Sequence, residues 1–454
     1  MTFESSVIRH VMNPLWLMRE SRLDELRFRK EFSTLPTMPV AELRRRQEQR
    51  FRDVIKHAFS NCDFYRRELN DIGVHPSELG VDEISVFPIL SKEIIRENIE
   101  GLIAKNISPD TLTEASTGGS TGTPMRFYRD SRCLSMRRAQ EQLFDSMMGY
   151  RVGDRAALFV AGLHAQGLVG NLKQRIRNRT DTLLLRFDPE LTAPEYMRRY
   201  HADMLKFKPR FVKCFPNSFL IFTEFLNAAG LAPPPIEAIS CTGENLYEWQ
   251  KELFETTWQA PVFERYGTKE CGVIAAEDQE HDGQLIFTEG VLVEILDDDD
   301  LPVGPGVIGR VIVTDLFNYG MPLIRYEIGD LAIFSSNTEA GIGLPKLDRI
   351  IGRDRDIIVS GDGQKRPGYL FVEAINAANI NAKCQVIQRV KGQLELRIVG
   401  DELLSQDLSP MVARFRELLG AGGDVTVTFV NDIARDPSGK YRYVVSEIAR
   451  TKTT

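Results

Sequence analysis

The clearest segment that could do chemistry is rich in glycine and hydroxyl side chains, and it runs Thr117-Gly118-Gly119-Ser120-Thr121-Gly122-Thr123-Pro124. Because glycine carries no Cβ, successive backbone N–H groups in such a segment can point at one anion. The segment therefore predicts a loop that binds the phosphates of a polyphosphate ligand.

The spacing of this loop differs from the spacings of the two best-known phosphate loops. A Walker A loop ends in glycine followed by lysine, and no lysine follows Gly118 or Gly119 at that distance. The glycines also miss the register of the dinucleotide-binding fingerprint. A flexible Gly/Ser/Thr linker is the alternative interpretation. The strand-like residues on either side, Leu112 and Pro124 to Tyr128, favour a hairpin turn.

Three residues further along have side chains suited to nucleotide chemistry. Glu270, beside a glycine turn, is a hard oxygen ligand of the kind that Mg²⁺ binds together with substrate phosphates. Asp330 can accept both hydroxyls of a ribose. Lys440, on a Ser-Gly turn, is a flexible charge able to meet an oxygen that becomes more negative in a transition state. Taken singly, they could also be a surface carboxylate, a turn former and a solvated lysine.

The elements that must position these residues indicate an α/β protein of more than one domain. A chain of 454 residues exceeds the usual size of a single core. Residues 1–106 are helical and charge-rich, with a long amphipathic run from Glu42 to Phe59 and a capped helix start at residues 88–93. From residue 156 short apolar runs alternate with helical stretches, which predicts βαβ units and a parallel sheet covered by helices. We expect a large N-terminal domain of several subdomains (residues 1–352, with the helical entry segment 1–106) and a small, mobile α+β C-terminal lid domain (residues 353–454).

Net charge, cysteine spacing and the distribution of apolar residues exclude several classes of protein. The net charge of −7 argues against nucleic-acid binding, which needs a basic surface. The six cysteines form no C-x-x-C pair, so we expect reduced thiols in a cytoplasmic protein and neither a zinc site nor a disulfide framework. The first 19 residues do not look like a signal peptide. No apolar stretch of about 18 residues occurs, so no membrane span is predicted.

The order of the motifs resembles the adenylate-forming superfamily of acyl-CoA synthetases, peptide synthetase adenylation domains and luciferases. Within it, the chain is most similar to the phenylacetate–CoA ligase and CapK-like branch. The resemblance covers nearly the whole chain, from Phe87-Pro88-Ile89-Leu90-Ser91-Lys92 to Pro437-Ser438-Gly439-Lys440-Tyr441-Arg442.

This resemblance implies a role for each motif. Residues 117–124 would hold phosphates, Gly243-Glu244 would form the turn beside adenine, and the segment from Tyr266 to Glu270 would contact the nucleotide and, through Glu270, bind magnesium. The implied nucleotide-binding residues are Thr117, Gly118, Gly119, Ser120, Thr121, Gly122, Thr123, Gly243, Glu244, Tyr266, Gly267, Thr268, Asp330 and Arg353. The implied catalytic residues are Lys440, Glu270 and Lys269.

The chain departs from the family pattern at three positions. Lys269 stands where Ser or Thr is commoner, which adds a cation near the α-phosphate. Met125 follows the phosphate loop where many acyl-CoA synthetases have lysine, as expected for the ligase and CapK branch. Arg355 stands where a hinge aspartate or lysine is usual, so the pivot of the lid is expected at Arg355 or Asp356.

The implied reaction has two steps. A small carboxylic acid attacks the α-phosphate of Mg-ATP to give an acyl-adenylate and pyrophosphate, and a thiol then displaces AMP. The thiol would come from coenzyme A or from the phosphopantetheinyl group of a carrier protein acting in trans. Closure of the lid on the loop would bring Lys440 to the site.

Two other functions stay open at this stage. One is an adenylyltransferase that places AMP on a cofactor or polysaccharide precursor, and the other is a non-catalytic nucleotide-binding partner. The acid is not encoded in any motif: Phe159, Phe215 and Phe222 could line an aryl pocket, although such residues are more often core. A homodimer is also compatible with the sequence.

Overall fold

The structure is a computed structural model. It describes residues 3–20, 22–117, 124–160, 183–188, 191–336, 344–353, 356–378, 380, 382–400, 407–434 and 441–448. Contacts divide the chain into two compact units, one formed by Met1–Ile328 with Ile333–Arg349 and the other by Gly329–Ala332 with Ile350–Thr454. The predicted domain limits at residues 352 and 353 stay a prediction.

A large mixed sheet organises the first unit. Among the described residues eleven strands pair in the order β10-β11-β12-β13-β9-β8-β7-β6-β5-β3-β4. Their bounds are β3 Ala156–Phe159, β4 Leu184–Phe187, β5 Phe211–Cys214, β6 Ala238–Thr242, β7 Val262–Thr268, β8 Gly272–Glu277, β9 Gln284–Ile286, β10 Val291–Leu296, β11 Ile308–Asp315, β12 Tyr326–Phe334 and β13 Lys346–Arg353. Strands β12 and β13 contribute residues 329–332 and 350–353 to the second unit.

The predicted parallel sheet is correct for only part of this sheet. Strands β4, β3, β5, β6 and β7 run parallel to one another. The chain then reverses through a tight hairpin, so β8 pairs antiparallel with β7 and β9 pairs antiparallel with β8. Because a hairpin needs no crossover helix, the βαβ pattern ends at β7.

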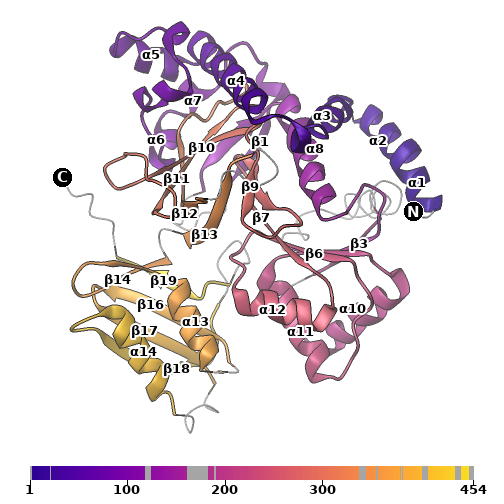
Figure 1. Cartoon of the computed structure of the whole chain (residues 1–454), viewed down its shortest axis with the longest axis vertical. Coiled ribbons are helices and arrows are strands. Elements are labelled where there is room, and N and C mark those ends of the chain that lie inside the picture. The colour runs from indigo at the N-terminus through magenta and orange to yellow at the C-terminus, as the bar shows by residue number, and fades with distance from the viewer. Residues whose placement is uncertain are drawn as a thin grey trace. The chain divides into compact units, whose positions relative to one another are not determined.

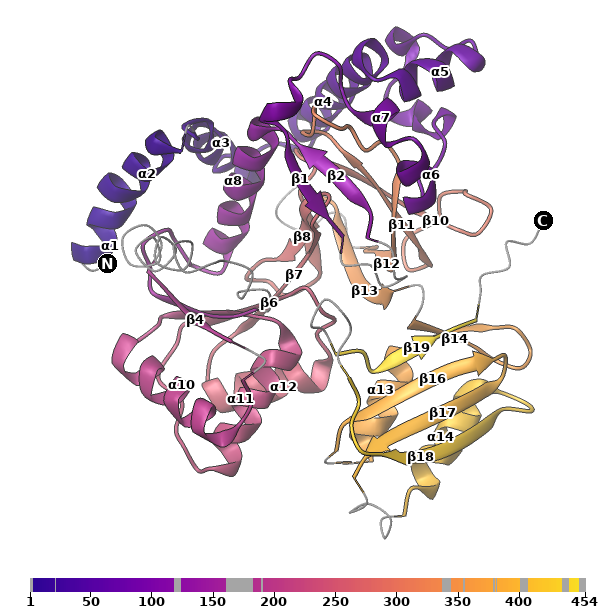
Figure 2. The same ribbon diagram turned by 180° about the vertical axis from the view of Figure 1, so that it is seen from behind.

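Three helices cover one face of the parallel part of the sheet (Figures 1 and 2). They are α10 (Pro194–Phe207), α11 (Pro216–Ala228) and α12 (Glu248–Trp258). Phe159 and Phe222 are fully buried in the cluster beneath them, with ring centroids 5.2 Å apart. Both side chains therefore belong to the hydrophobic core, which is the second of the two interpretations that the sequence allows for them. Trp258 also lies in this cluster, and its Nε1 donates to Thr223 Oγ1 at 3.0 Å, so the indole N–H is not left unpaired.

Helix α8 (Ser131–Met147) packs near the parallel part of the sheet and contacts β8. Its N-terminus is capped by Asp130, whose Oδ1 accepts from Cys133 N at 2.8 Å. The second Asp130 oxygen accepts from the backbone N–H groups of Tyr319 and Gly320, both at 2.9 Å. One carboxylate thus fixes both the start of α8 and the loop that follows β11.

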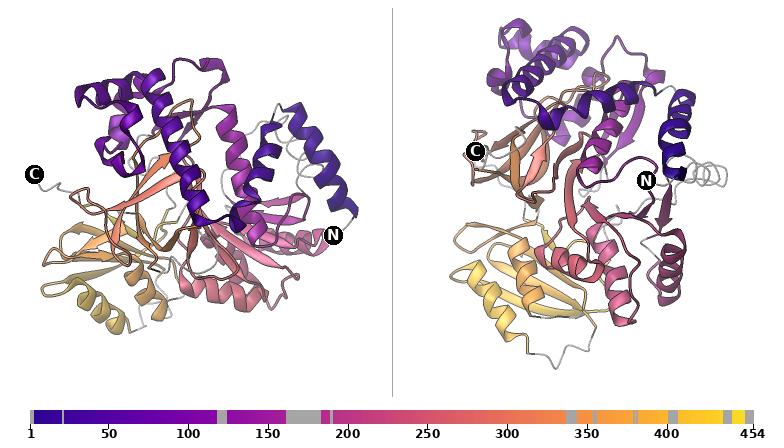
Figure 3. Two further views of the ribbon diagram at one scale, coloured as in Figure 1. Left: turned by 45° about the horizontal axis from the view of Figure 1, so that its top comes forward. Right: turned by 45° about the vertical axis from the view of Figure 1, so that its right-hand side comes forward.

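The N-terminal helices surround α8, and both views of Figure 3 show the indigo helices beside it. Helix α3 contacts α8, where Gln142 Nε2 donates to Glu25 Oε1 at 3.0 Å. The α-helical segments are α1 Phe3–Val7, α2 Asn13–Arg19, α3 Asp24–Phe32, α4 Val40–Asn61, α5 Asp63–Asp71, α6 Lys92–Glu97 and α7 Ile99–Leu102. The predicted amphipathic run 42–59 is confirmed as α4. The predicted helix start is confirmed at α6, where Ser91 Oγ accepts from Ile94 N at 3.2 Å.

The second unit has a four-stranded sheet in the order β18-β17-β16-β19 and a separate β14–β15 hairpin. Helices α13 (Tyr369–Ala377) and α14 (Ser409–Leu419) lie on the same face of that sheet in Figures 1 and 2. Phe371 and Phe415 meet edge to face between the helices, with centroids 5.1 Å apart. The strands are β14 Ile357–Val359, β15 Lys365–Pro367, β16 Cys384–Val390, β17 Gln393–Val399, β18 Asp424–Val430 and β19 Val444–Ser446. The predicted α/β fold with a small α+β C-terminal part is confirmed.

The six cysteines are buried and unbridged. Burial raises the pKa of the Cys62 and Cys384 thiols to about 12, so these thiols are not reactive thiolates at neutral pH. Within the described parts of the chain, no helix combines the length and apolar character needed to cross a membrane.

Candidate active site

The segment Tyr266-Gly267-Thr268-Lys269-Glu270 lies at the end of β7 and in the turn to β8. A register shift falls between Tyr266 and Gly267, and Gly267 pairs with Val273 across the hairpin. A Cβ at Gly267 would lie 2.4 Å from the carbonyl oxygen of Gly272, so the strands can approach this closely only with glycine there. Thr268 Oγ1 closes the turn by accepting from Cys271 N at 3.0 Å.

Glu270, the predicted magnesium ligand, is held from two sides. Glu270 is only 6% exposed, and Tyr326 donates its hydroxyl to Glu270 Oε1 at 2.9 Å. Its backbone carbonyl accepts from Arg137 Nη2, while Arg137 Nη1 donates to the carbonyl of Lys269 at 3.0 Å. Arg137 also forms an ion pair with Asp315 at 2.6 Å. The carboxylate is therefore fixed in orientation and its backbone in position.

Both side chains of the Arg137–Asp315 ion pair are buried, at 7% and 1% exposure. Burial lowers the pKa of Arg137, but neighbouring acidic groups, Asp315 among them, outweigh it and hold that pKa above its usual value. Burial raises the pKa of Asp315, opposed mainly by Arg137. Asp315 Oδ1 also accepts from Phe317 N at 2.8 Å. An ion pair with these additional hydrogen bonds can be tolerated in an interior.

Gly243 and Glu244, predicted to lie beside adenine, follow the end of β6. Gly243 has φ +80°, and a Cβ there would lie 2.6 Å from the ring of Phe215, so only glycine fits this turn. Glu244 Oε2 accepts from Asn217 N at 3.1 Å, in the first turn of α11. A carboxylate is favoured at that position by the free N–H groups of the helix start. The Gly243-Glu244 turn is thus anchored to α11, and its contact with adenine stays a prediction.

Only the base of the predicted phosphate loop lies among the described residues. Strands β1 (Thr113–Ser116) and β2 (Arg126–Arg129) form the predicted antiparallel hairpin, with Ser116 opposite Arg126. Thr117 accepts a hydrogen bond from Met125 N through Oγ1 and donates its own N–H to the Met125 carbonyl, both at 3.0 Å. Residues 118–123, and with them Gly118, Gly119, Ser120, Thr121, Gly122 and Thr123, lie outside the described residues.

Asp330 and Arg353, both predicted to bind the nucleotide, lie together in the second unit. Asp330 is 6% exposed, in strand β12 and not in a turn, and its Oδ1 pairs with Arg353 Nε at 2.9 Å. Asp356, one of the two predicted hinge residues, forms an ion pair with Arg442. Burial raises the pKa of the Asp356 carboxyl, and Arg442 opposes that rise. Arg355 and Lys440 lie outside the described residues, and their roles stay predictions.

Two residues at this site were not predicted from the sequence. Tyr326 lies four residues before Asp330, and a tyrosine among apolar strand residues gives no sign that its hydroxyl reaches Glu270. Arg137 lies in the middle of α8, where an arginine is usually solvated. Its contacts with residues 269, 270 and 315 span more than 130 positions, so no local pattern could have shown them.

The residues at Glu270 fit a magnesium ion bound mainly through a substrate. Among the described residues, Tyr326 engages one carboxylate oxygen of Glu270, which leaves the other for a cation. In the parts of the chain that the structure describes, no three His, Cys, Asp or Glu side chains are grouped so that they could cage a metal. A cation at Glu270 would therefore take its other ligands from phosphates and water, as Mg²⁺ does.

The chain is also similar in sequence to known proteins. Residues 358–447 match the profile of the CapK C-terminal domain. The chain is 23% identical over 409 residues to Protein CapK of Staphylococcus aureus, which covers 88% of this chain and 89% of that protein. It is 23% identical over 444 residues to the phenylacetate-coenzyme A ligase of Thermus thermophilus, which covers 90% of this chain and 98% of that protein.

The fold also resembles that of a solved ligase structure. A crystal structure of 2-hydroxyisobutyryl-CoA ligase in its postadenylation state, in complex with 2-HIB-AMP, matches with a TM-score of 0.72. The sequences are 20% identical, and the match covers 90% of each chain. The chain is therefore similar in sequence to Protein CapK and to phenylacetate-coenzyme A ligase over nearly its whole length, and it shares the fold of the solved ligase.

Proposed function

We propose that the protein activates a small carboxylic acid with ATP and then transfers the acyl group to a thiol such as that of coenzyme A. In the first step a carboxylate oxygen of the acid bonds to the α-phosphorus of ATP, and pyrophosphate leaves. In the second step the thiol sulfur bonds to the acyl carbon, and AMP leaves.

The observation that carries this proposal is the buried Glu270 carboxylate, fixed by Tyr326 and held in the turn that Arg137 anchors. A Mg²⁺ ion at such a carboxylate would neutralise charge on the phosphates of ATP. Fixed groups of this kind act mainly by positioning and charge neutralisation, which is what phosphoryl and adenylyl transfer require.

The remaining assignments are part of the same proposal. Thr117 and the loop after it bind the phosphates, Tyr266 and the Gly243-Glu244 turn contact adenine, and Asp330 binds the ribose with Arg353 beside it. Lys269 and Lys440 supply cations to the phosphate and carboxylate oxygens. Rotation of the C-terminal domain about Arg355 or Asp356 is proposed on the family resemblance alone.

Pyrophosphate release tests the first step. The intact chain with Mg-ATP should release pyrophosphate with at least one member of a panel of small aliphatic, aryl, hydroxy and dicarboxylic acids. Glu270→Gln keeps an acceptor for Tyr326 but removes the charge, so we expect release to fall by about a hundredfold or more. Glu280→Gln makes the same change at an exposed position and should leave release unchanged. Absence of release with every acid would refute the activity, whereas an unaffected Glu270→Gln variant would refute only the metal assignment.

Coenzyme A separates this function from an adenylyltransferase. The match to the CapK C-terminal domain is the observation that favours an adenylyltransferase as the second candidate function. The name of Protein CapK, unlike that of the phenylacetate-coenzyme A ligases, does not mention coenzyme A. We expect a thioester and free AMP when coenzyme A is added. AMP joined stably to an acceptor, with no thioester formed, would select the adenylyltransferase.

A further inference from the structure

Arg325, the residue before Tyr326, has a left-handed backbone conformation with φ +53°. Such a conformation is usual at the end of a helix, where Lys208 and Gln259 adopt it after α10 and α12. Arg325 instead stands directly before strand β12 and is only 4% exposed. Because a left-handed conformation costs free energy in a residue that carries a Cβ, neighbouring contacts must hold Arg325 in it.

The Arg325 side chain is held by two separate parts of the first unit. Its Nε and Nη2 donate to the two carboxylate oxygens of Glu294 at 3.2 and 3.0 Å, in the fork geometry that matches a carboxylate. Its Nη1 donates to the backbone carbonyls of Phe87 at 2.9 Å and Ser85 at 3.3 Å, in the segment that precedes α6. The guanidinium therefore joins strand β10 to the helical N-terminal segment.

The backbone around Arg325 is held as well. Arg325 N donates to Thr314 Oγ1 at 2.9 Å, and the Arg325 carbonyl accepts from Leu90 N at 2.8 Å. Glu327 N donates to the Leu90 carbonyl at 3.0 Å, and Leu90 forms an isolated parallel bridge with Tyr326. These bonds fix the chain on both sides of Tyr326, and they thereby fix the direction in which its side chain leaves the backbone.

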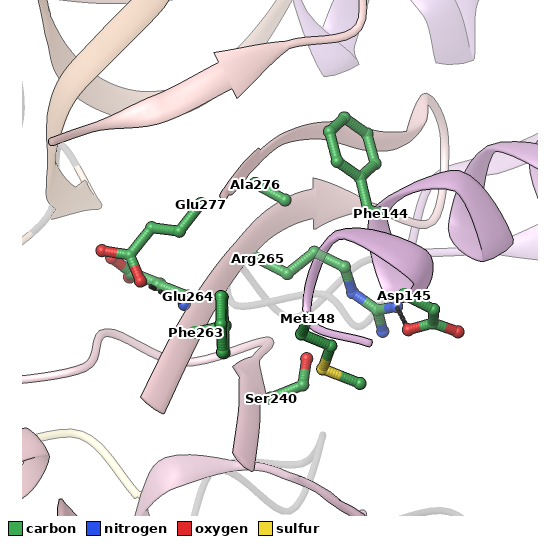
Figure 4. Close-up of a pocket in the computed structure, with 9 residues that line it drawn as sticks. All are labelled: Phe144, Asp145, Met148, Ser240, Phe263, Glu264, Arg265, Ala276 and Glu277. Carbon is green, nitrogen blue, oxygen red and sulfur yellow. Dashed lines mark hydrogen bonds and ion pairs between the residues drawn. The ribbon is translucent and has the colours of Figure 1, made fainter. Parts of the chain in front are cut away.

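Glu270, which accepts from the Tyr326 hydroxyl, is anchored separately to helix α8. Arg137 of α8 donates to the backbone carbonyl of Glu270. Farther back along β7, Arg265 extends toward Asp145 of α8, as Figure 4 shows, and its Nη1 lies 3.6 Å from Asp145 Oδ1. Because the hairpin that carries Glu270 has these anchors of its own, it would not follow a shift of Tyr326. Such a shift would therefore break the hydrogen bond between the two side chains.

We infer that Arg325 is a positioning residue for the proposed adenylation: its left-handed conformation aims the Tyr326 hydroxyl at Glu270 and so orients the carboxylate for a magnesium ion. This inference rests on the proposed function and deepens it, because it names a residue that acts on the metal site through Tyr326 and not as a ligand. A purely structural arginine would join β10 to the N-terminal segment and have no effect on metal binding.

Two substitutions at this position separate the backbone conformation from the side chain. Arg325→Ala removes the side-chain bonds and keeps the Cβ, so we expect residue 325 to leave the left-handed region and Tyr326 to turn away from Glu270. The Mg²⁺ concentration for half-maximal pyrophosphate release should then rise by about 10–100-fold, as for loss of a hydrogen bond to a charged group. Arg325→Gly removes the same bonds, but glycine adopts positive φ without steric cost, so its rise should be smaller than that of Arg325→Ala.

A double variant tests whether Arg325 acts through Tyr326. If it does, Arg325→Ala combined with Tyr326→Phe should need the same Mg²⁺ concentration as Tyr326→Phe alone, within about twofold, because both changes remove one hydrogen bond. Effects that multiply would show that Arg325 acts independently of the hydroxyl and would overturn the inference. Arg29→Ala is the control, since Arg29 of α3 is a partly buried arginine with an ion pair to Glu25 and a 2.8 Å hydrogen bond to Asn13 Oδ1. This control should lower stability and leave the Mg²⁺ dependence unchanged.

A metal-binding measurement keeps the inference separate from the proposed activity. The probe is Mn²⁺, bound to the intact chain in the presence of ATP and without any acid, and detected by the relaxation of solvent water protons. Binding should weaken by about 10–100-fold in Arg325→Ala and in Tyr326→Phe, and it should stay unchanged in Arg29→Ala.

The inference is overturned if the wild type and Arg325→Ala bind Mn²⁺ alike, whether tightly or not at all, or if Arg325→Gly is impaired as much as Arg325→Ala. If Arg325→Ala does not fold, Glu294→Gln takes its place, because it keeps Arg325 and weakens the contact that holds its side chain. This variant should also weaken Mn²⁺ binding, and unchanged binding would overturn the inference. Absence of pyrophosphate release with every acid would instead count against the proposed function and leave the Mn²⁺ comparison intact.

Discussion

Replacing Tyr326 with phenylalanine tests whether the orientation of Glu270 matters for the metal. The Tyr326 ring is fully buried, so phenylalanine keeps its packing and removes only the hydroxyl that donates to Glu270 Oε1 at 2.9 Å. Because Glu270 is only 6% exposed, bulk water cannot readily replace that donor. A hydrogen bond to a charged group is worth about 1.5–3 kcal/mol, and about 1.4 kcal/mol is a factor of ten. We therefore expect pyrophosphate release to need about 10–100-fold more Mg²⁺ for half-maximal rate.

Tyr65→Phe is the matched control for this experiment. Tyr65 is 1% exposed, and its hydroxyl donates to the carbonyl of Pro322 at 2.8 Å and accepts from Ile324 N at 3.1 Å. The control should lose stability in chemical denaturation, as Tyr326→Phe does, but keep the Mg²⁺ concentration for half-maximal rate. If both variants keep the wild-type Mg²⁺ dependence, the hydroxyl of Tyr326 does not position a metal-binding carboxylate.

Two further predictions concern stability. Arg137→Met leaves the buried Asp315 carboxylate without its cation, so urea unfolding should show a loss of about 3–5 kcal/mol, partly recovered by adding Asp315→Asn; a loss below about 1 kcal/mol would contradict the structural role of the pair. Glu264 has a folded-state pKa raised from 4.5 to about 7, so its protonated form is favoured by folding and its unfavourable contribution develops as pH rises from about 4.5 through 7. Glu264→Gln should therefore gain stability over the wild type by up to about 3 kcal/mol at pH 8 and by little at pH 4.5, since one pKa unit is about 1.4 kcal/mol. A gain independent of pH would show that folding does not raise the pKa of Glu264.

Local signals predicted the elements that carry the motifs. The strand-like residues on both sides of the phosphate loop predicted the β1–β2 hairpin, and the apolar spacing of residues 42–59 predicted α4. The alternation of short apolar runs and helices predicted the parallel strands β3 to β6. Each of these features depends on residues that are neighbours in sequence, so periodicity and turn chemistry are enough to reveal it.

Long-range contacts could not be predicted in the same way. The mixed character of the sheet depends on how β7 turns back onto β8, and the motif there was interpreted for its chemistry and not for its hairpin. Arg137 and Tyr326 reach Glu270 from segments 133 residues before it and 56 residues after it. The ion pair of Asp145 from α8 with Lys213 from β5 likewise joins residues 68 positions apart in the sequence.

By itself, the sequence determined which residue types are present for nucleotide chemistry, their order, and the helices and strands that carry them, because these depend on side-chain chemistry and short-range periodicity. Only the tertiary structure decided that Glu270 is buried beneath a tyrosine hydroxyl, that Asp330 pairs with Arg353, and that Asp145 pairs with Lys213. Burial and pairing are properties of groups brought together from distant positions, and they set the energy of every charge at the site.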